Sequence, residues 1–409
     1  MGTVLVTDAN ERAALAVIRS LGKRGIRVIA ADSTSYSTGF FSKYCSDRIL
    51  YPSPIHNKSR FIKSLLSFIK RNDVDLIIPV TDFTMIPIVE NLDAFEKYTR
   101  VAAPPPEIAI KAYDKFETMK LAKRCNIPCP ETFLVEDMNS LREIARNLPY
   151  PIVIKPRMKV FWKGEKAVIL KVTSRNYAYN PEDLLSKYSD IYHRVKDFVP
   201  QDFFVVQEYV RGKGFGVSVL LANGNPYAVF CHERLREYPI TGGASTYRVS
   251  TWNRELVKYA ITLLREMNWQ GVAMVEFKLD RESGEARLIE VNGRFWGSLA
   301  LAINSGVDFP FLLYLSVVEK KIRNNVLDKY KIGVSQRWLI PGDILWLLSL
   351  IKHRKGVLSG FKEFFSSSKD DIICLNDLQP FIGSLLSSTN LLLEMLRRKR
   401  NVYGETIIQ

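Results

Sequence analysis

Two glutamates and an asparagine on a predicted β-hairpin could hold a divalent cation. The hairpin covers residues 271–292 and carries Glu276, Glu290 and Asn292. If a three-residue loop closes it, with Gly284 in the left-handed conformation, Glu276 lies directly opposite Glu290, with their Cβ atoms about 5 Å apart. Two like charges at this distance are destabilising unless a cation lies between them. Mg²⁺ commonly takes one or two carboxylates together with waters and phosphate oxygens, so the hairpin favours a magnesium site.

The alternative is an exposed hairpin on which both glutamates are simply solvated. Two observations weigh against it. Ile289 and Val291 alternate with polar residues, so the second strand is expected to be half-buried. Arg294 follows the strand and adds a cation where the charge of a phosphate would lie.

A second polar stretch lies upstream of this hairpin. Arg234 and Arg236 are two residues apart and precede a loop that contains Gly242, Gly243 and Ser245. Exposed amides and hydroxyls in such a loop can hold an oxyanion or a phosphate. The alternative is an ordinary loop that links a strand to the next helix.

The N-terminal part of the chain alternates strands with helices. We expect strands at 3–7, 27–31 and 75–80, and helices at 11–23 and 61–70. This alternation predicts a parallel sheet with helices on both faces, whose ligands bind beyond the carboxyl ends of the strands. The polar residues expected at that edge are Asp8, Asn10, Asp32, Thr81 and Asp82. The first turn lacks a G-x-G-x-x-G pattern, so dinucleotide binding is not expected there.

Three parts are expected along the chain, and the overall class is α/β with an α+β central part. Residues 1–112 form the parallel α/β part, which ends after the stiff Pro104-Pro105-Pro106 break. Residues 113–325 contain the hairpin described above and a further antiparallel pair around the turn at 223–226. Residues 326–409 are expected to form a small, mainly helical domain.

Five motifs in chain order resemble the ATP-grasp superfamily over about residues 1–320. They are Tyr113-Asp114-Lys115, Asn126-Ile127-Pro128-Cys129-Pro130, Pro151-Ile152-Val153-Ile154-Lys155-Pro156, Val206-Gln207-Glu208-Tyr209-Val210-Arg211-Gly212, and the set Glu276, Glu290 and Asn292. The resemblance implies a pre-ATP-grasp domain followed by a two-lobed ATP-grasp fold, with lobe A over about 125–206 and lobe B over about 207–325. It also implies that ATP and Mg²⁺, or Mn²⁺ in its place, are bound.

The same resemblance implies roles for individual residues. Lys115 and Lys155 would contact the nucleotide phosphates, and the backbone carbonyl of Gln207 and amide of Val210 would read the adenine edge. Glu276, Glu290 and Asn292 would hold the metal. In members related to the carbamoyl-phosphate synthase large chain and to D-aspartate ligase, a stretch like that of Arg234, Gly242, Gly243 and Ser245 lines the acyl-phosphate site. Arg294 and this loop would stabilise the charge on the transferred phosphoryl group.

Two features depart from the family pattern. Many members carry a ribose-binding carboxylate about where Gly214 stands, so Glu208 or another group would have to replace it. The loop that covers the phosphates is usually glycine-rich, but residues 157–166 contain one glycine and several basic residues. Lys163 in this loop is expected to contact phosphate through its side-chain charge.

These patterns predict an ATP- and Mg²⁺-dependent carboxylate–amine ligase that works through an acyl phosphate. Its partners would be a small carboxylate, such as an amino acid, and an amine. Two alternatives remain open: a phosphotransferase that stops at phosphoryl transfer, and a basic nucleic-acid-binding or membrane-surface protein with a degenerate ATP-grasp fold.

Composition limits the remaining choices. Lysines and arginines number 58 against 43 aspartates and glutamates, and the resulting +15 charge is diffuse. We therefore favour an anionic small molecule over nucleic acid. The sequence shows no signal-peptide pattern and no long apolar run, and its five scattered cysteines suit reduced thiols, so a cytoplasmic protein without a zinc site is expected. A homodimer is left open.

The C-terminal part leaves one question open. Apolar residues around Trp338 and Trp346 precede a basic cluster at 352–355, and a second basic run lies at 397–400. Such a pattern is typical of a membrane-surface helix, and equally of a buried helix in a small helical domain. We prefer the buried helix and keep peripheral membrane contact as the alternative.

Overall fold

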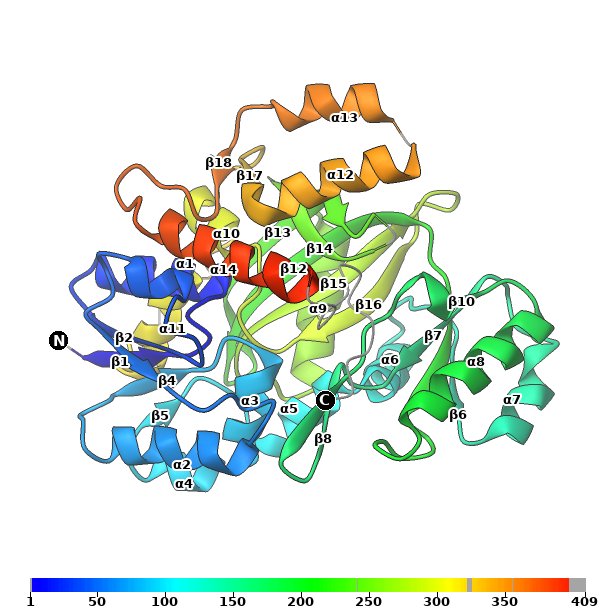
Figure 1. Ribbon diagram of the computed structural model, residues 1–409, viewed down its shortest axis with the longest axis horizontal. Coiled ribbons are helices and arrows are strands. Elements are labelled where there is room, and N and C mark those ends of the chain that lie inside the picture. Colours follow the sequence, from blue (N-terminus) through cyan, green and yellow to red (C-terminus); the bar gives the residue numbers. More distant parts are fainter. Residues whose placement is uncertain (1, 241, 322–325, 355, 397–409) are drawn as a thin grey trace.

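The computed structural model describes residues 2–240, 242–321, 326–354 and 356–396, and it contains four β-sheets (Figure 1). The first sheet has five parallel strands in the order β3-β2-β1-β4-β5. Its strands are β1 (Thr3–Val6), β2 (Arg27–Asp32), β3 (Asp47–Leu50), β4 (Leu76–Ile78) and β5 (Arg100–Val101). The predicted parallel α/β fold of this part is confirmed.

Helices cover both faces of this sheet because successive side chains of each strand point to opposite faces. Val4 and Val6 pack with α1 (Arg12–Gly22), whereas Leu5 packs with α2 (Lys58–Ile69). The other helical elements of this part are η1 (Thr38–Phe41), α3 (Asp82–Val89), α4 (Leu92–Glu96) and α5 (Pro106–Tyr113).

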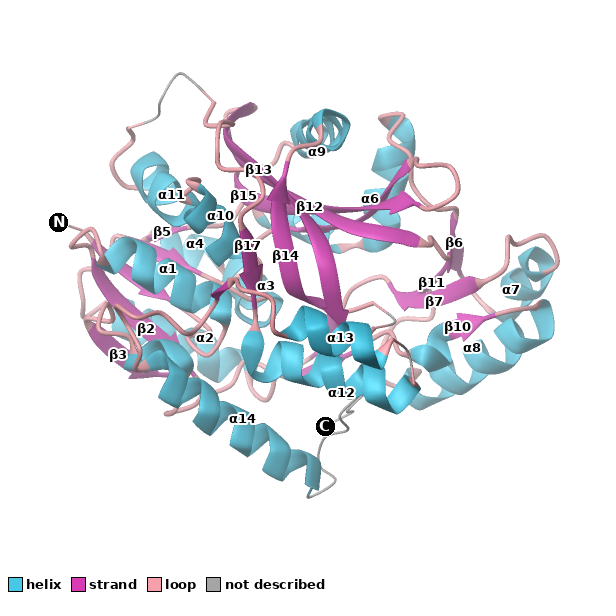
Figure 2. Cartoon of the chain, turned by 90° about the horizontal axis from the view of Figure 1, so that it is seen from above, coloured by secondary structure: helices cyan, strands magenta, loops and turns pink. Residues whose placement is uncertain are grey.

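The second sheet has four strands in the order β10-β7-β11-β6, with α7 and α8 on one face (Figure 2). Its elements are β6 (Thr132–Val135), α7 (Met138–Ala145), β7 (Ile152–Pro156), η2 (Ser174–Asn176), β10 (Tyr177–Ala178), α8 (Pro181–Val195) and β11 (Phe204–Glu208). Between β7 and η2 the chain forms a separate hairpin of β8 (Val160–Lys163) and β9 (Lys166–Ile169).

The β8–β9 hairpin reaches across to the N-terminal part of the chain. The indole Nε1 of Trp162 donates to the Pro54 carbonyl at 3.1 Å, and the Ala167 amide donates to the Ile55 carbonyl at 2.8 Å. The carboxylate of Glu165 accepts from the amide and the hydroxyl of Ser59 at the start of α2. These contacts fix the hairpin between the first sheet and the second.

The third sheet is the largest, with the order β16-β15-β12-β13-β14-β17-β18. Its elements, with the helices between them, are β12 (Gly212–Ala222), β13 (Asn225–Tyr238), β14 (Ala244–Thr251), α9 (Arg254–Glu266), β15 (Gly271–Asp280), β16 (Ala286–Asn292), α10 (Leu299–Ser305) and α11 (Phe309–Val317). One face packs on α6 (Lys115–Arg124) and α9, and the other shares a core with α10, α11 and α1. The antiparallel pair predicted around 223–226 is confirmed as β12 and β13.

The C-terminal part is less separate than predicted. It contains helices α12 (Ile344–His353), α13 (Val357–Phe364) and α14 (Pro380–Leu396), and the kinked turn η3 (Leu339–Asp343), in which Ile340 is not helical. However, β17 (Ser335–Arg337) pairs with β14 and β18 (Lys369–Asp370) pairs with β17, so this part extends the large sheet. Helix α14 contacts η1 of the N-terminal part. The domain boundaries at 112 and 325 stay predictions.

The expected burial of the helix around Trp346 is only half right. Trp346 is 7% exposed and lies under the guanidinium of Arg236, but the opposite side of α12 faces solvent. Lys355 and the basic run at 397–400 lie outside the described residues. Within the described residues no single helix is long and apolar enough to span a bilayer, and α10 and α11 meet that criterion only as a pair bent by 90°.

Candidate functional site

The two glutamates predicted to face each other do so. Glu276 on β15 pairs with Glu290 on β16, in an antiparallel register that also places Met274 opposite Asn292. A bulge directly after Glu276 shifts the register toward the loop, and Gly284 has the expected positive φ of 70°. The side-chain amide of Asn292 donates to Glu276 Oε1 at 2.9 Å and to Glu290 Oε1 at 3.4 Å. The structure thus gathers the three predicted metal ligands at one place.

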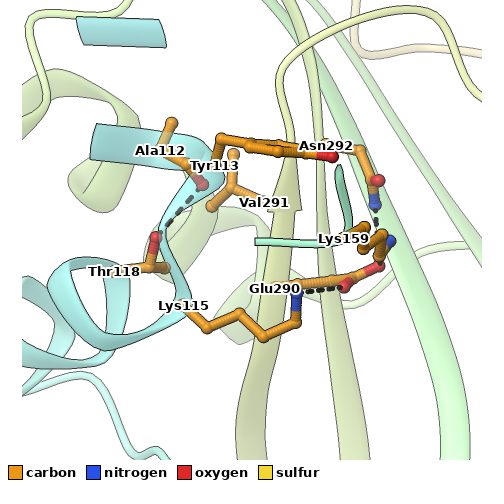
Figure 3. A pocket seen from close by; sticks show the side chains of 8 residues that line it. All are labelled: Ala112, Tyr113, Lys115, Thr118, Lys159, Glu290, Val291 and Asn292. Carbon is orange, nitrogen blue, oxygen red and sulfur yellow. Dashed lines mark hydrogen bonds and ion pairs between the residues drawn. The ribbon is translucent and has the colours of Figure 1, made fainter. Parts of the chain in front are cut away.

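Three cations neutralise these carboxylates, and Figure 3 shows the two lysines beside Glu290. Lys159 Nζ lies 2.8 Å from Glu290 Oε1, and Lys115 Nζ lies 3.9 Å from Glu290 Oε2. Arg234 Nη2 lies 2.5 Å from Glu276 Oε1. Burial alone would raise the pKa of Glu290, but Lys159 and Lys115 outweigh it and lower that pKa. Burial raises the pKa of Glu276, and Arg234 offsets only part of the increase.

Lys159, rather than Lys163, contacts the carboxylate of Glu290. The expected contact of Lys163 with phosphate stays a prediction. Lys163 is exposed at the end of β8, where its ammonium donates to the Asp197 carbonyl and lies over the ring of Phe198. Lys159 and Lys163 are four residues apart, a spacing that would place both on one face of a continuous strand, but Lys159 precedes β8 and lies outside its alternation. The basic character of this loop indicated a phosphate-facing lysine, but the loop's conformation decides which one reaches the carboxylates.

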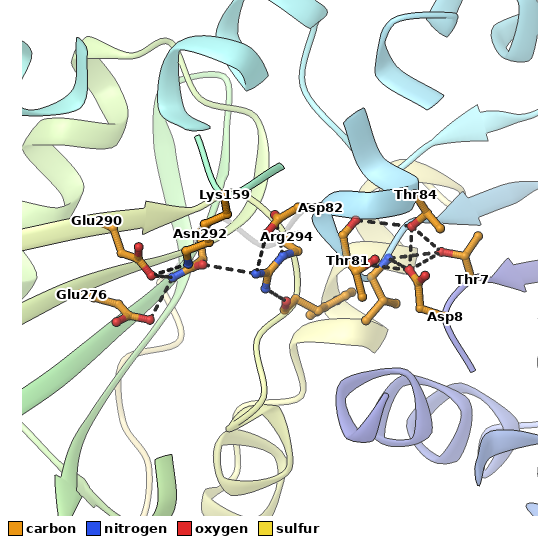
Figure 4. A network of polar contacts seen from close by, with 12 residues as sticks. Thr7, Asp8, Thr81, Asp82, Thr84, Lys159, Glu276, Glu290, Asn292 and Arg294 are labelled. Carbon is orange, nitrogen blue, oxygen red and sulfur yellow. Dashed lines mark hydrogen bonds and ion pairs between the residues drawn. The ribbon is translucent and has the colours of Figure 1, made fainter. Parts of the chain in front are cut away.

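The N-terminal part supplies a carboxylate that the predicted site did not include. Arg294 forms a bidentate pair with Asp82, with Nε to Oδ1 at 2.7 Å and Nη2 to Oδ2 at 3.0 Å. Asp82 is the first residue of α3, directly beyond the carboxyl end of β4. Its position at the sheet edge was predicted, whereas its contact with Arg294 depends on the tertiary arrangement. Figure 4 shows that this pair joins the two parts of the molecule.

A second polar network lies beside Asp82 at the same edge of the first sheet (Figure 4). Asp8 Oδ2 accepts from the Thr84 hydroxyl at 2.6 Å and from the Thr81 amide at 2.9 Å. Burial raises the pKa of Asp8, and these hydrogen bonds offset part of the increase. Asp32 accepts from the Asn10 amide at 2.8 Å. The polar residues predicted for this edge therefore lie together, within reach of the large sheet.

Lys155 and Gln207 are brought together on neighbouring strands of the second sheet. The Lys155 ammonium donates to Gln207 Oε1 at 2.6 Å, and Gln207 Nε2 donates to the Thr132 hydroxyl at 2.8 Å. Burial, with help from the charge of Lys115, lowers the pKa of Lys155 to about 8. Burial likewise lowers the pKa of Lys115 to about 8, although Glu290 acts in the other direction. Both lysines therefore lie where a compact anion would offset the cost of burying their positive charge.

The predicted adenine-reading segment lies at the end of β11. The carbonyl of Val210 accepts from the Lys278 ammonium at 3.1 Å, and the Glu208 carboxylate accepts from the Glu131 amide at 3.2 Å. Glu208 thus ties the end of β11 to the start of β6. Its proposed contact with a ribose stays a prediction.

Gly214 stands next to a carboxylate that the sequence did not suggest. A Cβ atom at Gly214 would lie 3.0 Å from Glu237 Oε1 and 3.0 Å from Arg234 Cδ. Glu237 comes from β13, the neighbour of β12 in the sheet. The Glu237 carboxylate therefore lies beside position 214, where the resemblance implied an acidic group.

The predicted oxyanion loop differs from the expectation. Residues 244–251 form β14, so the turn between β13 and β14 is short and Ser245 belongs to a strand. The Ser245 hydroxyl is buried and bonds backbone carbonyls of Arg236 and Tyr247, which leaves it unsuited to hold an oxyanion. Gly242 has a positive φ of 122°, and a Cβ atom at Gly243 would collide with the Tyr238 carbonyl, so both glycines shape the turn.

Arg236 is also directed away from the carboxylates, although Arg234 contacts one. Arg236 is buried between the rings of Tyr247 and Trp346, and its Nη1 lies 3.5 Å from Asp343. Register irregularities between residues 234 and 237 of β13 accompany this change of direction. Arg236 therefore ties the C-terminal helices to the sheet.

The donor set fits a metal ion that is held partly by a nucleotide. Among the residues that the structure describes, no group of three or more His, Cys, Asp or Glu side chains is arranged as a metal site. Two carboxylates and one amide are few for a metal held by protein alone, but they suit Mg²⁺ bound together with phosphate oxygens. Asn292 presents its nitrogen to the glutamates and its oxygen to Arg294, so its amide would have to turn to bind a cation.

Comparisons with known proteins point to one superfamily. Residues 201–337 match the family described as ATP-grasp in the biosynthetic pathway with Ter operon. The N-terminal section of the carbamoyl phosphate synthase large chain from Methanopyrus kandleri is 23% identical over 297 residues, which are 69% of this chain and 49% of that protein. The α-aminoadipate–LysW ligase LysX from Saccharolobus solfataricus is 30% identical over 133 residues, which are 32% of this chain and 47% of LysX. The matched regions thus span about half of each relative.

The fold is found in solved structures as well. Biotin carboxylase from Campylobacter jejuni, determined as a β,γ-ATP complex, superposes with a TM-score of 0.63 at 17% identity, covering 81% of this chain and 74% of that one. At this identity the likeness concerns the fold alone. Residues 201–337 thus match an ATP-grasp family model, the chain is similar in sequence to carbamoyl phosphate synthase large chains, and its fold is similar to that of biotin carboxylase.

Proposed function

We propose that this protein is an ATP- and Mg²⁺-dependent ligase that joins a carboxylate to an amine. The observation that carries the proposal is the pair of partly buried, facing carboxylates Glu276 and Glu290, surrounded by Lys115, Lys159 and Arg234. Such an arrangement is costly unless it serves to bind something, because two like charges and their cations must all be partly desolvated.

In the proposed cycle, the two glutamates exchange their lysine and arginine partners for a cation, and the lysines contact the nucleotide phosphates instead. In the structure, lysine and arginine neutralise the glutamates. When the nucleotide binds, Lys115, Lys155 and Lys159 turn to its phosphates, and Glu276 and Glu290 become available to a cation. Bound Mg²⁺ would screen the phosphate charge during transfer. The protein contributes positioning and electrostatic stabilisation rather than a covalent intermediate of its own.

Arg294 lies on the side of the site that faces the N-terminal part, where the carboxylate substrate is proposed to bind. An oxygen of that substrate attacks the γ-phosphorus of ATP, the bond to the bridging oxygen breaks, and ADP leaves. The amine then attacks the acyl carbon, phosphate departs, and the nitrogen loses a proton. Arg294, oriented by Asp82, stabilises the charge that develops on the transferred phosphoryl group.

An amino acid or a similar small acid is the proposed carboxylate substrate. This step of the proposal draws on the similarity to LysX, whose name gives it as a ligase of α-aminoadipate, an amino acid, and LysW. The polar edge formed by Asp8 and Asp32 provides acceptors for an ammonium group within the same part of the molecule.

The test is ADP release measured with purified protein, Mg²⁺ and a panel of carboxylates and amines. Hydroxylamine in the assay should trap an acyl phosphate as a hydroxamate. Glu290→Ala is expected to lower kcat/KM at least about 100-fold, because the metal loses a ligand. Glu282→Ala is the matched control, since Glu282 is exposed on the same hairpin and should leave the rate unchanged.

Other outcomes would replace the proposal. ADP release with a stable phosphorylated product and no amide would indicate a phosphotransferase that stops at phosphoryl transfer. Failure to bind ATP with Mg²⁺, combined with salt-sensitive binding to DNA or RNA, would indicate a degenerate fold used for polyanion binding.

A further inference from the structure

The α12–α13 hairpin exposes apolar side chains that a protein surface ordinarily buries. On α12, Ile344, Leu348 and Ile351 are all exposed, by 38%, 55% and 45%. Their spacing of four and three residues places them on one side of the helix. Trp346 and Ser349, on the opposite side, are the buried residues of this helix. The outer face of α12 is therefore apolar where a surface helix is normally polar.

Helix α13 repeats the pattern. Leu358 is 87% exposed, Phe361 is 42% exposed, and Phe365 at its C-terminal cap is 78% exposed. These residues again follow a spacing of three and four. The buried side is marked by Gly360, where an added Cβ atom would lie 2.5 Å from Leu350 Cδ1 of α12. The two helices thus pack closely on each other and still leave an apolar stripe on each.

The hairpin lies at the rim of the molecule, beyond the large sheet (Figure 1). Trp346 and Arg236 attach it to β13, so its position is set by a buried contact rather than by the exposed stripes. The stripes are therefore not required for packing within the chain, and burying them against something outside the chain would be favourable.

The charged residues around the two apolar stripes indicate which kind of surface the hairpin binds. Residues 344–369 contain five lysines or arginines and one glutamate, Glu363. Lys352 and Arg354 lie at the C-terminal end of α12, and Lys362 lies on α13; all three are exposed. Lysine is depleted at the cores of protein interfaces. Leucine and phenylalanine beside lysine and arginine are instead typical of helices that lie in the interface of an anionic bilayer.

We propose that the α12–α13 hairpin docks this protein on the surface of an anionic phospholipid membrane. Leu348, Leu358 and Phe365 enter the boundary between headgroups and acyl chains, and Lys352, Arg354 and Lys362 contact the headgroup phosphates. The docking is peripheral. It is independent of the proposed ligase activity, since none of these residues contacts the carboxylate site.

The test is flotation of the full chain with vesicles of equal parts phosphatidylglycerol and phosphatidylcholine, and with vesicles of phosphatidylcholine alone. Wild-type protein should float with the anionic vesicles and bind the neutral ones at least about tenfold more weakly. The double variant Leu358→Ser, Phe365→Ser should lower the partition coefficient on anionic vesicles at least about tenfold. Lys362→Glu should weaken only the part of binding that depends on anionic lipid.

A matched control carries the same kind of change elsewhere. Leu50→Ser with Tyr179→Ser removes a leucine and an aromatic ring that are 57% and 66% exposed on other parts of the chain. It should float like the wild type. Thermal unfolding of both double variants should match that of the wild type, which separates a lost contact from a lost fold.

Three results would overturn the proposal. One is equal flotation of the wild type and the Leu358→Ser, Phe365→Ser variant. Another is a wild-type dimer in light scattering that this variant dissolves, without any vesicle binding, which would make the stripes a contact between copies of the chain. The third is loss of binding on replacing Arg397, Arg398, Lys399 and Arg400 with alanine, with no effect of the hairpin variants.

Discussion

Glu237 illustrates how a side chain from one strand can replace a group that the neighbouring strand lacks. Its carboxylate lies 3.0 Å from the position that a Cβ atom at Gly214 would take, and 3.6 Å from Nη1 of Arg234. We expect it to bind the ribose hydroxyls of the nucleotide. A hydrogen bond to a charged acceptor of this kind contributes about 1.5–3 kcal/mol.

Glu237→Gln should therefore raise the KM for ATP about tenfold with little change in kcat, because the bond is made equally in the ground state and the transition state. The readout specific to the ribose is 2′-deoxy-ATP. The wild type should bind 2′-deoxy-ATP more weakly than ATP. The variant should bind the two about equally, because it has already lost the contact with the ribose. Glu233→Gln serves as the control. Glu233 lies on the same strand as Glu237, and its carboxylate pairs with Lys213 of β12. An equal 2′-deoxy penalty in both proteins would exclude the ribose contact.

The lowered pKa values of Lys115 and Lys155, about 8 each, predict pH-dependent nucleotide binding. Below about pH 8 both ammonium groups are charged and ready for phosphate. Above it they lose their protons in the free protein, and binding must take protons up. ADP affinity should therefore fall by roughly one to two orders of magnitude from about pH 7.5 to about pH 9. Titration calorimetry in buffers of different ionisation enthalpy measures both the affinity and the proton uptake.

Lys115→Arg should remove the share of this pH dependence that Lys115 contributes, because a guanidinium stays charged. The same pKa shifts affect folding stability in the direction opposite to their effect on nucleotide binding. Between about pH 8 and the ordinary lysine pKa of 10.5, the unfolded chain binds more protons than the folded one, so these two lysines make the protein more stable as pH rises. An ADP affinity that is flat across this pH range would show that the lysines do not meet the phosphates.

At the scale of elements, the β8–β9 hairpin positions Lys159 through contacts that are remote from the carboxylates. Glu165 lies in the turn of this hairpin, and its carboxylate accepts from Ser59 at the start of α2. The backbone carbonyl of Glu165 accepts from the Lys58 amide at 3.0 Å. The hairpin is thus held over the site from the N-terminal side. Its glycine-poor sequence is consistent with a cover that works through an anchored lysine rather than through backbone amides.

Glu165→Ala should loosen this anchor without touching the site. We expect faster amide hydrogen exchange over residues 160–169 and a rise of about three- to tenfold in the KM for ATP, since Lys159 would be less well positioned. Lys166→Ala, on the same turn, is the control and should change neither. Faster exchange with an unchanged KM would mean that the position of the hairpin does not limit nucleotide binding.

At the scale of the whole molecule, buried arginines fasten the C-terminal part to the N-terminal sheet. Arg19 on α1 pairs with Asp377 at 2.8 Å and donates to the carbonyls of Asp371 and Ile372. Arg248 from the large sheet pairs with Asp371, and so does Arg12. One short C-terminal stretch therefore ties the first sheet to the third.

Arg19→Ala should leave Asp377 buried without its partner and lower the free energy of unfolding by about 3–5 kcal/mol. Urea denaturation should show the loss as a lower midpoint. Arg27→Ala removes an arginine whose contact with Asp47 is exposed, so it should change stability by less than about 0.5 kcal/mol. A wild-type midpoint for Arg19→Ala would show that the C-terminal part is not required for the stability of the rest.

Several features follow from local pattern alone. The parallel first sheet, the β12–β13 pair and the facing of Glu276 and Glu290 were all predictable, because strand alternation and a left-handed glycine fix which residues share a face. The order of the five motifs likewise sufficed to suggest the ATP-grasp superfamily. These are properties of residues close together in the chain.

What the tertiary structure decided concerns residues that are far apart in the chain. The approach of Asp82 to Arg294, of Glu237 to Gly214 and of Lys159 in place of Lys163 depends on how separate sheets meet. The same holds for Ser245, which a new strand pairing removes from the predicted loop. Spacing along the sequence carries no information on these contacts, because each is set by packing between elements whose relative orientation no local pattern encodes.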